Sequence, residues 1–296
     1  WKEGLWLHLT WPRWTPEVKE FFIAFGAVTI GAASVVISPF IDTIIASLLP
    51  TGSRTVLYYA DRINQLPLGV LGIALGTVLL PEMSARLARG DRAGSDTAQN
   101  RSAALTLLLT LPFVCAFIAI PGTIMRAIFA HGAFDRGAAG LAAQVLAAYG
   151  IGLPAMALIR ILAPTFYARH DTATPMRATL IAMTCNIALK FVFVWGMGLG
   201  VAGIALGTAF GAWINVGVLT WYGRSRELLA IETIFVRSLP AALAAALACG
   251  AGAWIGVGLA GRYGDIAALA AAILLAAVFY GAVLAVFRKA LPLQRA

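Results

Sequence analysis

An adjacent acid and base interrupt an otherwise uncharged apolar stretch of this sequence. Asp61 and Arg62 lie near the start of LYYADRINQLPLGVLGIALGTVLLP, residues 57–81. Charged side chains at membrane depth cost roughly 2.5 to 3.5 kcal/mol each, so they usually mark a substrate or ion pathway. A guanidinium is always charged, and its fork of donors fits phosphate oxygens. We therefore predict that Arg62, with Asp61 beside it, binds an anionic substrate; the alternative is that Arg62 only pairs with Asp61.

Three further polar residues, Asp42, Asn186 and Lys190, fall within apolar runs. Asp42 follows Pro39 by three residues, so a bent helix could present its carboxylate to a cavity as an ion ligand or proton carrier. Lys190 lies one helical turn beyond Asn186 and is the alternative partner for Asp42. A rise of about 1.5 Å per residue places Asp42, Arg62 and Lys190 in one layer of the membrane. A structural ion pair between Asp42 and Lys190 is the favoured hypothesis.

No pattern in the sequence is typical of catalysis or of metal or cofactor binding. The chain has no Gly-rich phosphate loop, nucleophile elbow or HExxH spacing. Its three cysteines lie in separate apolar runs and are interpreted as packing residues. We therefore predict no catalytic residue, no metal, no cofactor, and a protein that is not an enzyme.

The elements that position these residues are predicted to be membrane-spanning helices. The 296-residue chain is 60% hydrophobic and 12% charged, whereas soluble domains carry about 25% charged residues. Most of its uncharged runs reach the roughly 20 residues that span a bilayer, which predicts an all-α, polytopic helical bundle. The eight expected helices are residues 19–49, 54–84, 102–126, 138–166, 177–196, 201–222, 236–260 and 266–288.

The basic residues are distributed between the expected helices rather than in one patch. Although the formal net charge is +9, this distribution argues against nucleic-acid binding. Most of the arginines and lysines fall on one side if the first span begins in the cytoplasm, and the positive-inside bias then places both termini there. The polar segment 85–101 lies on that side and is expected to be a mobile loop between the second and third spans.

Two segments carry a family resemblance. LLPTGSRTVLYYADRINQLPLGVLGIALGTVLLPEMS, residues 48–84, closely resembles the signature of the MurJ/MviN family of lipid II flippases. APTFYARHDTATPMR, residues 163–177, is similar to that family's loop after its tenth helix. The eight expected helices then correspond to the last eight of the family's fourteen. The resemblance implies the MOP exporter fold, with two six-helix lobes around a cationic cavity and two extra helices that form a groove for a polyprenyl tail.

The resemblance also implies a function. The expected activity is transport of lipid II, the undecaprenyl-pyrophosphate-linked peptidoglycan precursor, from the cytoplasmic to the periplasmic leaflet of the bacterial inner membrane by alternating access. Lipid II, membrane lipids and the missing N-terminal six-helix lobe would be its partners. Arg62, preceded by Asp61, matches the family's cavity arginine on this helix. The alternatives are a related exporter of other lipid-linked oligosaccharides or small cations, a membrane glycosyltransferase, and a structural scaffold.

The resemblance bears on ion coupling as well. Asp42 matches an acidic residue that binds sodium in some members of the family, where the partner helix carries an Asn and, four residues later, an Asp. This chain has Asn186 and then Lys190, whose ammonium would occupy or repel a cation site, so sodium coupling is not expected.

The expected domain organisation has four parts. They are a cytoplasmic or interfacial segment at 1–18, a six-helix transporter lobe at 19–222, a cytoplasmic linker at 223–235, and a two-helix lipid-tail hairpin with a cytoplasmic tail at 236–296. Glycines repeat every four residues at Gly203, Gly207 and Gly211, a spacing that lets neighbouring helices approach closely.

Overall fold

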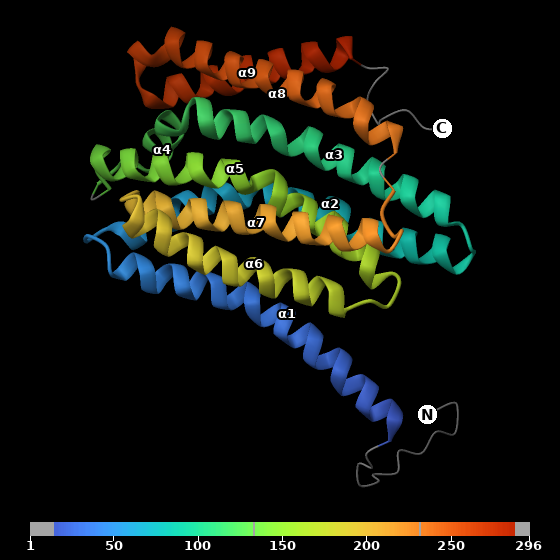
Figure 1. Ribbon diagram of the computed structural model, residues 1–296. Coiled ribbons are helices and arrows are strands. Elements are labelled where there is room, and N and C mark those ends of the chain that lie inside the picture. Colours follow the sequence, from blue (N-terminus) through green and yellow to red (C-terminus); the bar gives the residue numbers. More distant parts are fainter. Residues whose placement is uncertain (1–14, 133, 231, 288–296) are drawn as a thin grey trace, which may run out of the picture.

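The computed structural model describes residues 15–132, 134–230 and 232–287, which form helices joined by short turns (Figure 1). Most of the segment 1–18 and most of the expected C-terminal tail lie outside these residues. Within the described part the chain contains no strand, in agreement with the predicted all-α fold. The α-helices there are α1 (Pro16–Ser47), α2 (Ser53–Ala88), α3 (Arg92–Ala119), α4 (Pro121–Phe129), α5 (Arg136–Tyr167), α6 (Ala173–Phe191), α7 (Gly200–Ser225), α8 (Thr233–Ala260) and α9 (Asp265–Val286).

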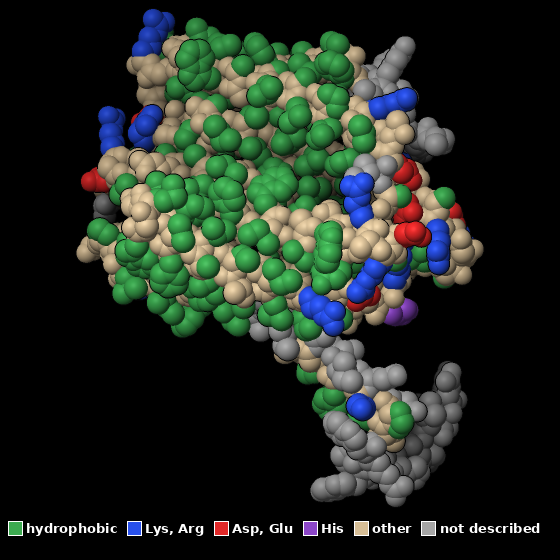
Figure 2. Space-filling model, viewed as in Figure 1, with side chains coloured by type: hydrophobic (Ala, Val, Ile, Leu, Met, Phe, Trp, Pro, Cys, Tyr) green, Lys and Arg blue, Asp and Glu red, His purple; other side chains and the backbone are tan. Residues whose placement is uncertain are grey.

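The helices form a bundle suited to a membrane. Over the described residues, α3, α5, α6 with the π-helix Val192–Gly196 that continues it, α7, α8 and α9 are each long and apolar enough to cross a bilayer. On the face seen in Figure 2, lysine and arginine side chains gather at the two ends of the bundle and hydrophobic side chains cover the band between them. The prediction of a polytopic membrane bundle is confirmed.

The expected mobile loop at 85–101 is wrong. α2 continues to Ala88 and α3 already begins at Arg92, so only three residues separate the two helices. Gly90, with a φ of 77°, makes the turn, and Asp91 caps α3 by accepting a hydrogen bond of 2.8 Å from the backbone nitrogen of Gly94. The predicted spans ended where the apolar residues end. A helix can continue beyond the membrane through polar residues when its end is capped.

The single helix expected at 102–126 is also wrong, because the chain breaks it at Ile120. There φ is −133° and ψ is 36°, and Pro121 then occupies the first turn of α4. Proline has no N–H to continue the preceding helix and favours the first turn of a new one. The expected break between the helices at 177–196 and 201–222 is confirmed, since a turn separates them in which Gly198 and Gly200 have φ values of 67° and 54°.

Small residues hold the centre of the bundle together. α5 is the most buried of the candidate spans and packs against α2, α3 and α7. A Cβ atom on Gly152 of α5 would lie 2.6 Å from the Cα atom of Ala209 in α7, so the two backbones are in contact. α1 and α6 lie side by side on one flank, and α8 and α9 cover α3 on the opposite flank (Figure 1).

The α8–α9 hairpin is closely packed and fastened to the other helices. A Cβ atom on Gly256 would lie 2.6 Å from the Cα atom of Ala272, so α8 and α9 touch through their backbones. The Tyr280 hydroxyl donates a hydrogen bond of 2.7 Å to the Leu108 carbonyl of α3. Arg126 Nε of α4 lies 3.0 Å from Asp265 Oδ1 at the start of α9. The hairpin is therefore attached to α3 in its middle and to α4 at one end.

Candidate functional site

The structure brings Asp42 of α1 and Lys190 of α6 together. The Lys190 ammonium donates a hydrogen bond to Asp42 Oδ1. Lys190 is completely buried and Asp42 is 8% exposed, so water screens this ion pair little. Thr43, beside Asp42, donates a hydrogen bond of 2.9 Å to the carbonyl of Pro39, in the part of α1 that the proline interrupts.

Glycines on α7 make room for the polar side chains of α6. A Cβ atom on Gly207 would lie 2.5 Å from Lys190 Cγ, and one on Gly211 would lie 2.6 Å from Asn186 Cβ. Asn186 is therefore buried one turn from Lys190, and its side-chain oxygen has no hydrogen-bond partner among the described residues. The glycine spacing seen in the sequence thus positions both of these predicted site residues.

We expect Gly207→Ala to destabilise the protein by about 1–3 kcal/mol, because the added methyl group would also lie 3.1 Å from the backbone nitrogen of Lys190, which cannot move aside cheaply. Gly217→Ala in the same helix is the matched control, since nothing lies within 4 Å of its added Cβ atom. Thermal unfolding in detergent measures both variants. Equal melting temperatures for Gly207→Ala and the wild type would contradict this packing.

Arg62 lies on an exposed face of α2. Its guanidinium carbon is 4.7 Å from the centre of the Tyr58 ring, one turn earlier. Asp61 is half-buried and accepts a hydrogen bond from Gln65 instead of pairing with Arg62. Within the described part of the chain, no carboxylate lies within ion-pair distance of Arg62. Its donors are thus available to an anion, and substrate binding by Arg62 stays a prediction.

The sequence did not indicate that Tyr149 belongs to the same layer. This tyrosine is buried in α5 and lies near both Asp42 and Asp61. Tyr149 lies in an apolar run that gives no sign of its neighbours, so no sequence signal could have found it. The Gln65 contact could have been found, because residues four apart share a helix face.

Arg160 of α5 is a second arginine that the predicted site did not include. Its Nη1 atom donates a hydrogen bond of 2.9 Å to the carbonyl oxygen of Leu68, the residue after Pro67 in α2. Arg160 thereby joins α5 to the same helix that carries Arg62.

An apolar groove begins beside Arg62. It has a volume of about 480 Å³ and lies between α2, α3, α4 and the α8–α9 hairpin. Ile63 and Leu66, which neighbour Arg62 in α2, form one wall, and Ile273 and Tyr280 of α9 contribute another. An exposed cation next to such a groove suits an amphiphile with an anionic head. Among the described residues, no group of three or more His, Cys, Asp and Glu residues is placed to hold a metal ion.

Comparison with known proteins identifies one family. The family model described as lipid II flippase MurJ matches residues 1–282. A probable lipid II flippase MurJ of Rhizobium tropici is 41% identical over 212 residues, which cover 72% of this chain and 39% of that protein. The homologue in Rhizobium meliloti strain 1021 is 38% identical over 242 residues, or 80% of this chain and 45% of that one. The chain thus spans less than half the length of these relatives.

Solved structures show the same fold. The lipid II flippase MurJ in an inward closed conformation matches with a TM-score of 0.71 and 24% identity, over 94% of this chain and 56% of that one. An outward-facing MATE transporter of the MOP superfamily matches with a TM-score of 0.60 and 16% identity, over 88% of this chain and 63% of that one. The MOP exporter fold expected from the sequence is confirmed.

Proposed function

Because the chain belongs to the lipid II flippase MurJ family, we propose that it forms one lobe and the accessory hairpin of a lipid II flippase. The protein would move the undecaprenyl-pyrophosphate-linked precursor from the cytoplasmic to the periplasmic leaflet of the bacterial inner membrane, for peptidoglycan synthesis. A second six-helix lobe, outside this sequence, would face the exposed side of α2. Lipid II and the surrounding membrane lipids are its other proposed partners.

The observation that carries this proposal is the position of Arg62 next to the apolar groove. Lipid II has a pyrophosphate head and a long hydrocarbon tail, and the two parts need different surroundings. Arg62 offers bidentate donors to phosphate oxygens. The groove that starts at Ile63 and Leu66 offers a surface of hydrocarbon side chains from α2, α3 and α9. One lipid could thus place its head and its tail on adjacent parts of this chain.

Transport requires no chemical reaction at this site. In alternating access, two lobes rock about a central binding site, and the substrate leaves unchanged on the other side. Arg62 would hold the phosphate while water is excluded. Because the substrate leaves unchanged, the protein acts as a transporter and not as an enzyme. We place both ends of the chain in the cytoplasm, since most basic residues of the described part lie at the end of the bundle that holds the α2–α3 turn.

The proposed energy coupling does not use sodium. The Asp42 carboxylate, which would otherwise attract a cation, is neutralised by the buried Lys190 ammonium. Asp61 of the neighbouring helix α2 is half-buried and accepts a hydrogen bond from Gln65. The membrane potential, protons and ions other than sodium are the remaining classes of driving force.

Depletion of the full-length protein from growing cells should trap lipid II in the inner leaflet. A membrane-impermeant enzyme that cleaves the lipid II headgroup measures the accessible fraction, and mass spectrometry measures the total. We expect the accessible fraction to fall while total lipid II rises and stays chemically intact. An unchanged accessible fraction would contradict the proposal. Loss of another lipid-linked oligosaccharide from the outer leaflet would instead favour a related MOP exporter, the class to which the MATE neighbour belongs.

A further inference from the structure

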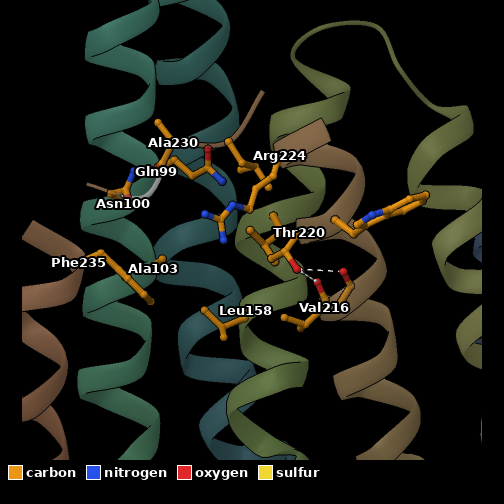
Figure 3. Close-up of a pocket in the computed structure, with 13 residues that line it drawn as sticks. Gln99, Asn100, Ala103, Leu158, Val216, Thr220, Arg224, Ala230 and Phe235 are labelled. Atoms are coloured by element: carbon orange, nitrogen blue, oxygen red, sulfur yellow. Dashed lines mark hydrogen bonds between the residues drawn. The ribbon is translucent and has the colours of Figure 1, made fainter. Parts of the chain in front are cut away.

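A second cavity lies toward the opposite end of the bundle, near the start of α3 and the end of α7. It has a volume of about 460 Å³, within the range of roughly 300–1,000 Å³ that is usual for ligand sites. α3, α5 and α7 form its walls, and residues between α7 and α8 close it. Its lining is mostly apolar and includes Ala103, Leu158, Val216 and Phe235 (Figure 3). It shares no lining residue with the groove beside Arg62.

Two polar groups point into this cavity. The Gln99 amide and the Arg224 guanidinium approach each other across its upper part in Figure 3. Gln99 is only 4% exposed, and its side chain lines the cavity. Arg224 also lines it and has no carboxylate within ion-pair distance in the described part of the chain. The amide and the guanidinium both offer N–H donors to the cavity, so a ligand that accepts hydrogen bonds is the expected complement.

The closing wall is held in place by α3. Asn100 Nδ2 donates a hydrogen bond of 2.7 Å to the Ala230 carbonyl, and the backbone nitrogen of Glu232 donates one of 3.1 Å to Asn100 Oδ1. Leu229 packs so closely on α7 that a Cβ atom on Gly223 would lie 2.1 Å from Leu229 Cδ1. The segment that closes the cavity is therefore held against both α3 and α7.

We propose that this cavity binds an anionic phospholipid, with the phosphate held by Arg224 and Gln99 and one acyl chain lying against Ala103, Leu158 and Phe235. The two polar groups lie where α3 begins and α7 ends, which is the depth of lipid headgroups. The apolar walls continue from there toward the middle of the bundle, as an acyl chain would. The proposal goes beyond lipid II transport and does not depend on it.

The binding test uses the full-length protein purified in detergent and native mass spectrometry of its lipid adducts. The probe is dioleoyl phosphatidylglycerol; dioleoylglycerol lacks the phosphate, and glycerol 3-phosphate lacks the chains. We expect saturable binding of phosphatidylglycerol and at least tenfold weaker binding of either analogue. Arg224→Gln should raise the dissociation constant about tenfold, because a charge-assisted contact is lost. Gln99→Leu should raise it several-fold.

Arg177→Gln is the matched control. Arg177 is also exposed, at the same end of the bundle, but it does not line the cavity. The control should change the dissociation constant less than twofold. Ala103→Leu should block binding while every charge stays in place, and thermal unfolding checks that each variant is folded. Equal losses in Arg177→Gln and Arg224→Gln, or equal binding of dioleoylglycerol, would overturn the proposal. Lipid II export is not the readout, so failure of the proposed function would leave this result intact.

Discussion

Arg62→Ala in the full-length protein is expected to abolish lipid II export while the amount of folded protein stays close to that of the wild type. The side chain is exposed, and its described contact is the Tyr58 ring at 4.7 Å. Loss of an exposed cation–π contact costs only roughly 0.5–1 kcal/mol, which is too little to unfold a domain. Loss of the bidentate phosphate contact removes the proposed head-binding group. Outer-leaflet lipid II and melting temperature measure the two effects separately.

Arg62→Lys should restore export only in part, since a point charge lacks the planar fork of donors. Arg54→Ala is the matched control, because Arg54 is an exposed arginine of the same helix. It should leave export nearly unchanged. Normal export by Arg62→Ala, or equal loss in Arg54→Ala, would show that Arg62 has no special role in substrate binding.

Neutralising one member of the Asp42–Lys190 pair should damage the protein more than neutralising both. A single change, Asp42→Asn or Lys190→Gln, leaves one buried charge without its partner, which costs about 3 to 5 kcal/mol. The double variant leaves two neutral groups that can still form a hydrogen bond. We therefore expect low yield and a reduced melting temperature for each single variant, and recovery of both for the double variant.

The pair between Glu82 and Arg86 is the control for burial. Its atoms are 2.9 Å apart, but the side chains are 41% and 34% exposed, respectively. Arg86→Gln should therefore cost at most about 1 kcal/mol. Export should also be the same in sodium and in potassium, because the Lys190 ammonium occupies the neighbourhood of Asp42. A double variant less stable than either single one, or export that needs sodium, would contradict this interpretation.

Hydrophobic runs predicted most of the helices because a membrane span must be both apolar and long. They located α5, α7, α8 and α9 to within a few residues of their ends. They failed at 85–101, where the sequence is polar but the helix is set by the Asp91 cap. They also missed the break at Ile120, because an apolar run gives no sign of where backbone hydrogen bonding stops.

The site could be predicted only in part. The sequence supplied Asp42, Asn186, Lys190, Asp61 and Arg62, because charged or amide groups within apolar runs are conspicuous. The depth of each residue along its helix also predicted that Asp42 and Lys190 would meet. Depth does not show how a helix is rotated about its own axis, and so it does not show which way a side chain points. That rotation decides that Arg62 is exposed while Lys190 is enclosed. It also decides that Tyr149 of α5 joins the layer.

The fastening of the α8–α9 hairpin has a mechanical consequence. Arg126 with Asp265 ties it to α4 at one end, and Tyr280 with Leu108 ties it to α3 in the middle. Asn100 ties its connecting segment at the other end. If the lobe tilts during transport, the hairpin must tilt with it as one rigid body. The distance from Arg62 to the far end of the groove would then stay constant. A lipid bound at Arg62 and in the groove would move with the lobe, without stretching and without release of its tail.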